Sequence, residues 1–458
     1  MLYKFLVKGE KSLLFQLHGV RLPHHKHTAK MKAERISTPK SVTIPMQMHI
    51  GAPAVPCVAV GDEVFVGQKI AEAGAGLSSP IYSGVSGKVK KIDEITAATG
   101  AKVRAVIIEC DGAQTVAEEI TPPEVHDRES FLAAVRGSGL VGLGGAGFPT
   151  AVKLNVPEGR VDTVVVNGAE CEPYITSDTR TMIDESDLVA EGLSAVMNYL
   201  KIPTAVIGIE KNKPEAIAEM KRVTKEMTGV TVRVLPSLYP QGGEKVLVYH
   251  TTGRVIGEGK LPLDAGVIVV NCTTLSLIAK YLRTGMPLIE KCVTVDGSAV
   301  KNPKNLIVPI GTAVRDVLEA CGGASQEPKK ILSGGPMMGV ALVDLNAPVL
   351  KQTNAVLFLG EKEAMPPKET ACIRCGKCLD ACPFGLSPVD LANAFAQSDD
   401  ETLEKLKVNL CMECGCCSYI CPAKRNLVQT NRLAKTRLRN YQQRKKQTEE
   451  KEKAARES

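Results

Sequence analysis

The chain has 458 residues, of which 44% are hydrophobic, and this length predicts three or four domains rather than one compact unit. The net charge of +7 lies in residues 425–458, which hold 11 Lys and Arg against 4 Asp and Glu. The remaining residues balance in charge, which argues against a nucleic-acid partner and leaves a basic C-terminal tail.

No stretch approaches the roughly 18 uncharged apolar residues of a membrane-spanning helix. The first residues, MLYKFLVKGEK, carry charge before the apolar core of a signal peptide can form. We therefore expect a soluble protein that is not exported. Its 15 cysteines are then expected to be metal ligands or ordinary thiols in a reducing compartment rather than disulfides.

Residues 1–45 form a basic N-terminal segment with four histidines: His18, His24, His25 and His27. A metal site is one interpretation of this cluster. It lacks cysteine partners and helical i, i+4 spacing, so we favour a segment that lies on the surface.

Residues 46–120 alternate short β-branched runs with glycine turns, which predicts paired β-hairpins. The segment resembles the β-sandwich of biotinyl and lipoyl carriers. Those carriers attach their cofactor to a lysine at a hairpin tip, whereas the corresponding turn, Ser83 to Gly87, contains no lysine. We therefore expect a structural or docking role for this sandwich hybrid.

Residues 121–285 alternate buried-strand runs such as VDTVVVNG with helical patterns such as SDLVAEGLSAVMNYLK. This alternation predicts a Rossmann-like α/β domain with a largely parallel sheet, whose ligands collect at the carboxyl ends of the strands. Residues 286–360 predict a small α+β module of the β-grasp type. A polar linker, 361–368, opens the last folded region, 361–430, and residues 431–458 are expected as the basic tail.

Two cysteine quartets with the spacing C-x₂-C-x₂-C-x₃-C-P carry the strongest signal, namely Cys372, Cys375, Cys378 and Cys382, and then Cys411, Cys414, Cys417 and Cys421. This spacing is the signature of two [4Fe–4S] clusters. Zinc sites are built from C-x₂-C pairs and do not require two quartets that end in Cys-Pro. The helical periodicity between the quartets predicts a helical ferredoxin domain, and Cys416 is expected to be a buried thiol.

The fourth cysteine of such a quartet ligates the other cluster. The predicted ligand sets are therefore Cys372, Cys375 and Cys378 with Cys421, and Cys411, Cys414 and Cys417 with Cys382.

A glycine-rich loop, GLGGAGFPTAVK, precedes an apparent helix start, where bare backbone N–H groups can approach a phosphate. Alone it is weak evidence, because it could also be a simple strand-to-helix turn. With VVVNGAECEP, YPQGGEK and VNCTT following in this order, the region resembles the flavin subunit of respiratory complex I, which binds FMN non-covalently and takes hydride from NADH.

The resemblance implies an FMN site with NADH as substrate. It places Gly142, Gly144, Gly145, Gly147 and Lys153 near the flavin phosphate, Phe148 near the nicotinamide, and Asn167, Glu170, Glu172, Tyr239, Gly242, Glu244 and Asn271 around the two nucleotides. Phe148, Glu170 and Glu172 are the expected catalytic residues. The two glutamates could instead be a solvated pair, and Tyr239 and Asn271 could be structural. Three positions depart from that family, since Leu143, Ala169 and Gly243 stand where it has Arg, Asp and Glu.

Three further motifs, HIGAPAVPCVAVGDEV, SGGPMMG at 333–339 and CIRCGKCLDACP, extend the resemblance to the C subunit of Rnf-type ferredoxin:NAD⁺ oxidoreductases. This implies an oxidoreductase subunit that passes electrons from NADH through FMN and two clusters, with ion translocation by partner membrane subunits and a ferredoxin-like subunit. It would lie peripherally on the cytoplasmic side of the membrane. The alternatives are a cytoplasmic adaptor that serves a soluble reductase, such as proline reductase, and a non-catalytic relay or scaffold subunit.

Overall fold

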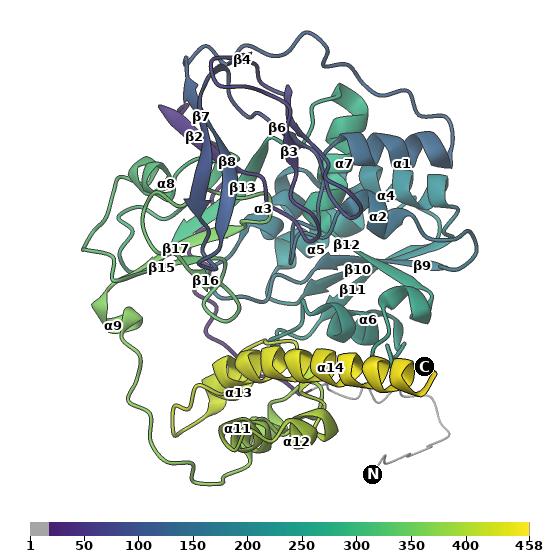
Figure 1. The fold of residues 1–458 in the computed structure, drawn as a ribbon. Helices are drawn as coiled ribbons and strands as arrows, with labels where there is room; N and C mark the ends of the chain where they lie inside the picture. The colour runs from purple at the N-terminus through teal and green to yellow at the C-terminus, as the bar shows by residue number, and fades with distance from the viewer. Residues whose placement is uncertain (1–17, 458) are drawn as a thin grey trace.

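The computed structural model describes residues 18–457, which form four domains in the order that the sequence predicts (Figure 1). The first is a β-sandwich of two antiparallel sheets. One sheet has the order β2 (Ser41–Pro45), β8 (Lys102–Cys110), β7 (Gly87–Thr96), β4 (Glu63–Val64). The other has the order β3 (Val55–Pro56), β5 (Lys69–Glu72), β6 (Ile81–Tyr82). The predicted sandwich hybrid is confirmed, but it begins at β2 rather than at residue 46.

In the turn from Ser83 to Gly87 the first four residues are buried and Gly87 is half-buried, so the turn is not displayed at a tip. A Cβ added to Gly84 would lie 2.6 Å from the carbonyl oxygen of Ile289 and 3.2 Å from Pro309. This turn therefore packs against the third domain, as a structural role requires.

The second domain has a parallel sheet with the order β11 (Val230–Leu235), β10 (Thr204–Glu210), β9 (Thr163–Gly168), β12 (Val267–Asn271). Side chains alternate between its faces, as the two-residue strand period requires. Val164 and Val166 pack in the core that α4 (Ser186–Leu200) and α7 (Cys272–Thr284) share, whereas Val165 packs beneath α6 (Glu244–Thr252). Helices α1 (Arg128–Gly137), α2 (Thr150–Leu154), α3 (Ser177–Asp184) and α5 (Pro214–Val223) and the 3₁₀ turn η1 (Pro262–Ala265) complete the domain.

The third domain is a six-stranded mixed sheet with the order β1 (Glu34–Arg35), β14 (Lys304–Pro309), β13 (Glu290–Asp296), β17 (Ala355–Leu359), β15 (Lys330–Ser333), β16 (Val340–Ala341). Helix α8 (Val314–Ala320) packs against it through Val314, Val317 and Leu318. The predicted β-grasp module is therefore present. Its edge strand β1 comes from the N-terminal segment, and both residues of this strand are exposed, so the segment lies on the surface while it extends the sheet.

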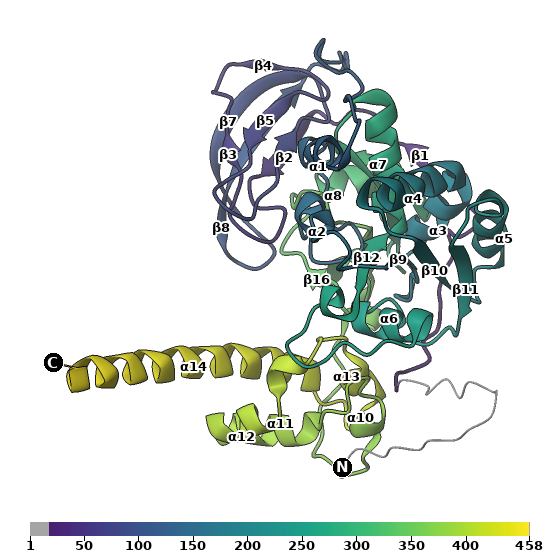
Figure 2. The same ribbon diagram turned by 90° about the vertical axis from the view of Figure 1, so that its right-hand side faces the viewer.

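Every element after Gly360 is helical: α9 (Glu361–Ala364), α10 (Lys377–Asp380), α11 (Pro388–Ala396), α12 (Asp400–Lys405), the turn η2 (Val408–Leu410), α13 (Cys416–Ile420) and α14 (Leu427–Glu457). The expected boundary between the helical domain and a tail at residue 431 is not seen, because α14 runs through that position unbroken. Its first turns pack on the helical domain through Ala434 and Leu438, and its later turns project away from the other domains (Figure 2). In the part of the chain that is described, no helix is long and apolar enough to span a bilayer.

Candidate functional site

The α/β domain has its topological switch point between β9 and β12. The chain runs from β9 outward through β10 and β11, and then returns to place β12 on the other side of β9. Ligands of open parallel sheets bind at such a point, beyond the carboxyl ends of the strands. Asn167 and Asn271 occupy these two ends and are paired in register. The two predicted asparagines are thus brought together at the place where the fold favours a ligand.

Asn271 also begins α7. Its side-chain oxygen accepts a 2.9 Å hydrogen bond from the N–H of Thr273, and its amide nitrogen donates to Asp178 at 2.8 Å. A Cβ on Gly144 would lie 2.6 Å from this amide nitrogen. Glycine is therefore required at 144 because the loop crosses directly over Asn271.

The glycine loop is a closed turn. The N–H of Gly142 donates to the carbonyl of Phe148 at 2.8 Å, and Gly147 has a φ of +71°, which favours glycine. Between these residues, Gly144, Gly145 and Ala146 are exposed, and their N–H groups have no partner among the described residues. A Cβ on Gly145 would meet nothing within 4 Å. The loop therefore offers bare amides beside open space, which suits a phosphate.

The loop that contains Tyr239, Gly242 and Glu244 lies against the same strand ends. Asn167 donates its side-chain amide to the carbonyl of Gly242 at 3.0 Å. Lys153 bridges Glu244 at 3.0 Å and the carbonyl of Val269 at 3.2 Å. Lys153 and Glu244, both predicted to lie at the nucleotide site, therefore form an ion pair with each other beside the strand ends.

Glu170 is buried and its carboxylate is held by α3. It accepts hydrogen bonds from the N–H groups of Asp178 (2.8 Å) and Thr179 (3.3 Å) and from the hydroxyl of Thr179 (2.7 Å). Burial raises its pKa, and the neighbouring ammonium of Lys26 acts in the opposite direction. Glu170 is therefore not a solvated residue, and its oxygens are already engaged by protein donors.

Glu172 is held by the SGGPMMG motif of the third domain. Its carboxylate accepts from the N–H groups of Met337 (3.0 Å) and Met338 (2.7 Å). A Cβ on Gly335 would lie 2.3 Å from a Glu172 oxygen, which explains a glycine in this motif. Burial raises the pKa of Glu172 to about 7, although both amides favour the ionised form. The SGGPMMG segment thus serves as an anion-binding turn for a residue of the neighbouring domain.

The N-terminal segment fastens this acidic loop. The ammonium of Lys26 donates to the carbonyls of Glu170 (2.9 Å), Glu172 (2.8 Å) and Ile175. Sequence reasoning missed Lys26, because nothing in its surroundings along the chain signals a partner about 145 residues away.

Two histidines of this segment, His25 and His27, both pack against Tyr174, and His24 and His27 each have a further hydrogen-bond partner. His24 receives a 3.3 Å hydrogen bond from Asn212, His25 stacks on Tyr174 with ring centroids 5.0 Å apart, and His27 bonds Asp296 at 3.0 Å. The rings of His25 and His27 lie with their centroids 5.9 Å apart, and all three histidines are exposed, as expected for a segment on the surface. His18 is exposed.

Three cysteines of the second quartet border a small cavity between the helices of the last domain. Cys411, Cys414 and Cys417 line this cavity, and so does Cys382 of the first quartet. Cys421 does not. These four cysteines border one apolar cavity, and they are the set that the crossed ligand pairing predicts for one [4Fe–4S] cluster. Cys416, off the register of the quartet, also borders the cavity and is fully buried.

Three cysteines of the first quartet and Cys421 of the second lie nearer to solvent. Cys372 and Cys375 are exposed, and Cys378 and Cys421 are half-buried. Burial raises the pKa of Cys378, and the nearby thiols of Cys421 and Cys372 raise it further. These four thiols therefore form the second group, at the outer surface of the domain.

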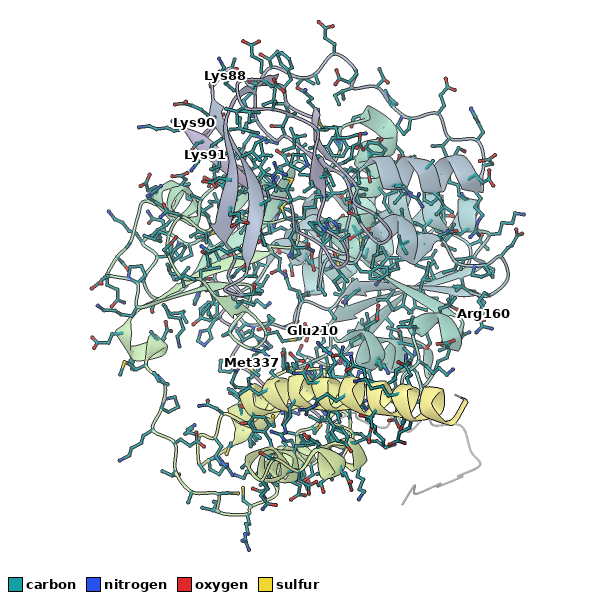
Figure 3. The ribbon with its side chains drawn as sticks, viewed as in Figure 1. Lys88, Lys90, Lys91, Arg160, Glu210 and Met337 are labelled. Carbon is teal, nitrogen blue, oxygen red and sulfur yellow. The ribbon has the colours of Figure 1, made fainter. Side chains whose placement is uncertain are left out.

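The loop that contains Tyr239 and Gly243 touches the segment of the second quartet directly. The phenol of Tyr239 donates to the carbonyl of Cys414 at 2.7 Å, and a Cβ on Gly243 would lie 2.5 Å from the terminal methyl carbon of Met412. Met337 belongs to the same buried cluster, and Figure 3 shows it between the α/β domain and the helical domain. The departure to glycine at 243 is thus explained, because Met412 occupies the space that a side chain would need. Leu143, another departure, is 1% exposed and belongs to the core.

Comparison with known families follows the same division. Residues 15–113 match the RnfC barrel sandwich hybrid domain, residues 135–280 the Nuo51 FMN-binding domain, residues 292–341 the SLBB domain, and residues 366–449 the 4Fe-4S dicluster domain. A flavin-binding α/β domain joined to two clusters defines the class of flavin and iron–sulfur oxidoreductase subunits. Its cofactors are FMN and [4Fe–4S] clusters.

Full-length relatives identify the particular family. The chain is 43% identical over 428 residues to the C subunit of the proton-translocating ferredoxin:NAD(+) oxidoreductase complex of Clostridium ljungdahlii, covering 92% of this chain and 93% of the relative. It is 41% identical to the C subunit of the Na(+)-translocating complex of Acetobacterium woodii, covering 92% and 96%. The C subunit of an ion-translocating oxidoreductase complex of Rhodobacter capsulatus is 39% identical, covering 94% and 84%. The chain belongs to this family of C subunits of Rnf-type complexes.

Proposed function

We propose that this chain is the NADH-binding subunit of a ferredoxin:NAD⁺ oxidoreductase complex and that FMN binds at the switch point between Asn167 and Asn271. The bare amides of Gly144, Gly145 and Ala146 would hold its phosphate. FMN, when bound, exchanges hydride with NAD(H) and single electrons with iron–sulfur centres. Phe148, which follows the loop, would offer an aromatic face to the nicotinamide.

The acidic residues act mainly by holding the site in shape. Glu170 is engaged by α3 and Glu172 by the Met337 and Met338 amides, so each fixes one end of the loop that borders the nucleotide site. The ammonium of Lys26 also holds this loop, because it donates hydrogen bonds to three of the loop's carbonyl groups. The proposed donor is NADH rather than NADPH, because the C subunits to which the chain is similar belong to ferredoxin:NAD(+) oxidoreductase complexes.

The electron route runs from the flavin to the cluster of Cys382, Cys411, Cys414 and Cys417, and then to the cluster of Cys372, Cys375, Cys378 and Cys421. The observation that carries this order is the hydrogen bond from Tyr239 to Cys414, which joins the flavin-side loop to the buried quartet. The cluster of Cys372, Cys375, Cys378 and Cys421 lies nearer to solvent, so it is the one that would exchange electrons with the partner. The proposed partners are a ferredoxin-like subunit and membrane subunits, with this chain peripheral on the cytoplasmic side.

Anaerobic purification tests this function. The expected protein holds about eight irons and eight labile sulfides, releases FMN rather than FAD, and is reduced by NADH much faster than by NADPH. Recovery of zinc without labile sulfide, or of folded protein without flavin, would contradict the proposal. Tagged chain isolated from cells should carry membrane subunits with it; isolation with a soluble reductase instead would favour the adaptor alternative.

A further inference from the structure

The helical domain is an internal repeat with an offset of 39 residues. The offset carries Cys372, Cys375, Cys378 and Cys382 onto Cys411, Cys414, Cys417 and Cys421, and it also carries Val389 onto Val428. The helices that follow the quartets, α11 and α14, are therefore equivalent. Most other residues of the two helices differ, and one of the differing pairs is Ala392 on α11, which corresponds to Asn431 on α14.

Asn431 faces the cavity of the second quartet. It lines that cavity together with the cysteines, it is 1% exposed, and its amide nitrogen lies 3.6 Å from the sulfur of Cys411. Its amide oxygen is buried without a hydrogen-bond partner among the described residues. A polar side chain in this position disfavours folding unless its polar atoms are satisfied.

Contacts of the neighbouring residues on α14 fix the position of the Asn431 side chain relative to Cys411. Lys435, one turn later on α14, donates to the carbonyl of Cys411 at 3.0 Å and pairs with Glu413. Arg432 pairs with the same Glu413 at 3.1 Å. These contacts tie α14 to the segment that carries Cys411. A thiolate sulfur only accepts, so the NH₂ group must face it, and this leaves the oxygen unpaired.

We propose that Asn431 tunes the second cluster by donating an N–H···S hydrogen bond to the Cys411 ligand, and that this bond separates the potentials of the two clusters. Hydrogen bonds to cluster sulfurs are one of the ways in which a protein sets a cluster potential. The bond stabilises the more negative, reduced state, so it raises the potential of the second cluster. Ala392, at the equivalent position of the first half, has no such donor. This inference rests on the ligand sets proposed above.

The test is a redox titration of the intact chain by paramagnetic resonance, with two centres first resolved in the wild type. Asn431→Leu, which keeps the volume and removes the donor, should lower the potential of the second centre and leave the first unchanged. The Fe–S(Cys) stretching bands should shift upward in resonance Raman spectra of the same sample. Asn393→Ala, on the exposed face of α11, is the matched control and should change neither potential.

An unchanged second potential with full iron content, or an equal shift of both centres, would overturn the inference. If the leucine variant fails to assemble, Asn431→Ala and Asn431→Ser decide, because they leave similar space and only serine can donate. A lower second potential in the alanine variant than in the serine variant supports the inference, and equal values reject it. Failure of the wild type to show two centres would instead refute the ligand assignment.

Discussion

The hydroxyl of Tyr239 donates a 2.7 Å hydrogen bond to the main-chain carbonyl of Cys414, across the boundary between the α/β domain and the helical domain. Burial raises the pKa of this phenol, so it remains a protonated donor throughout the physiological range. Val20 pairs with the backbone of Tyr239 through both its N–H and its carbonyl. Three separate segments of the chain therefore meet beside the buried quartet.

Tyr239→Phe should destabilise the attachment of the helical domain by about 1–3 kcal/mol, because the buried carbonyl of Cys414 loses its donor. The measurement is urea-induced loss of the second-centre resonance signal, with the first-centre signal followed in parallel. Tyr419→Phe is the control, since Tyr419 is 44% exposed in the same domain. Equal midpoints for the two variants would show that the bond contributes little.

Gly144→Ala and Gly145→Ala distinguish the effect of a steric clash within the protein from a direct effect on FMN binding. The added Cβ at 144 would collide with Asn271, so this variant should lose both stability and at least about tenfold in FMN affinity, or about 1.4 kcal/mol. The added Cβ at 145 meets no atom of the described residues within 4 Å, so it should weaken FMN binding without changing the melting temperature of the flavin-free protein.

Flavin fluorescence during titration and thermal melts of the flavin-free forms measure both effects. Gly257→Ala is the control, because its nearest contact, Lys260, lies at an ordinary 3.5 Å. Wild-type FMN affinity in Gly145→Ala would mean that the loop is not the phosphate cradle.

Glu172 should make stability depend on pH between about 4.5 and 7. Its folded pKa is raised to about 7 by burial, whereas an unfolded glutamate titrates near 4.3, so the native state retains a proton that the unfolded chain has released. The group's contribution is therefore greatest below this window and falls as the pH rises through it, by at most about 3 kcal/mol.

Infrared titration should show a protonated carboxyl band that disappears near pH 7 in the wild type and is absent from Glu172→Gln. The pH slope of the melting temperature should be flatter in the same variant. Glu215→Gln, at an exposed position of α5, should leave both unchanged. A carboxyl band that persists in Glu172→Gln would assign the titration to another residue.

If the fourth cysteine of each quartet ligates the other cluster, its replacement should impair the cluster held by the other quartet. Cys382→Ala should impair the centre held mainly by Cys411, Cys414 and Cys417, and Cys421→Ala should impair the centre held by Cys372, Cys375 and Cys378. The reason is that Cys382 lines the cavity of the second quartet, whereas Cys421 lies outside it. Paramagnetic resonance of the two reduced variants distinguishes the centres. Loss of the centre on the same side of the sequence as each mutation would show self-contained quartets.

The sequence by itself determined the order of domains and the chemistry of the metal sites. Strand and helix periods depend on neighbouring residues, and cluster ligation depends on the short spacing within each quartet, so both are local properties. The glycine at 144 and the asparagine at 271 were also recognisable from their motifs. Gly144 lies in a backbone turn and Asn271 begins a helix, and both requirements restrict the residue type at that position, so they can be recognised from the local sequence.

Only the tertiary structure decided what these residues contact. That β1 joins the third domain, that Lys26 holds the acidic loop, and that Glu172 is bound by Met337 and Met338 all depend on segments more than 140 residues apart. The basic tail became a helix that lines the second cluster cavity, because α14 buries Asn431, Ala434 and Leu438 against partners elsewhere in the domain. Composition records the charges of that segment, but only packing determines which of its faces is buried.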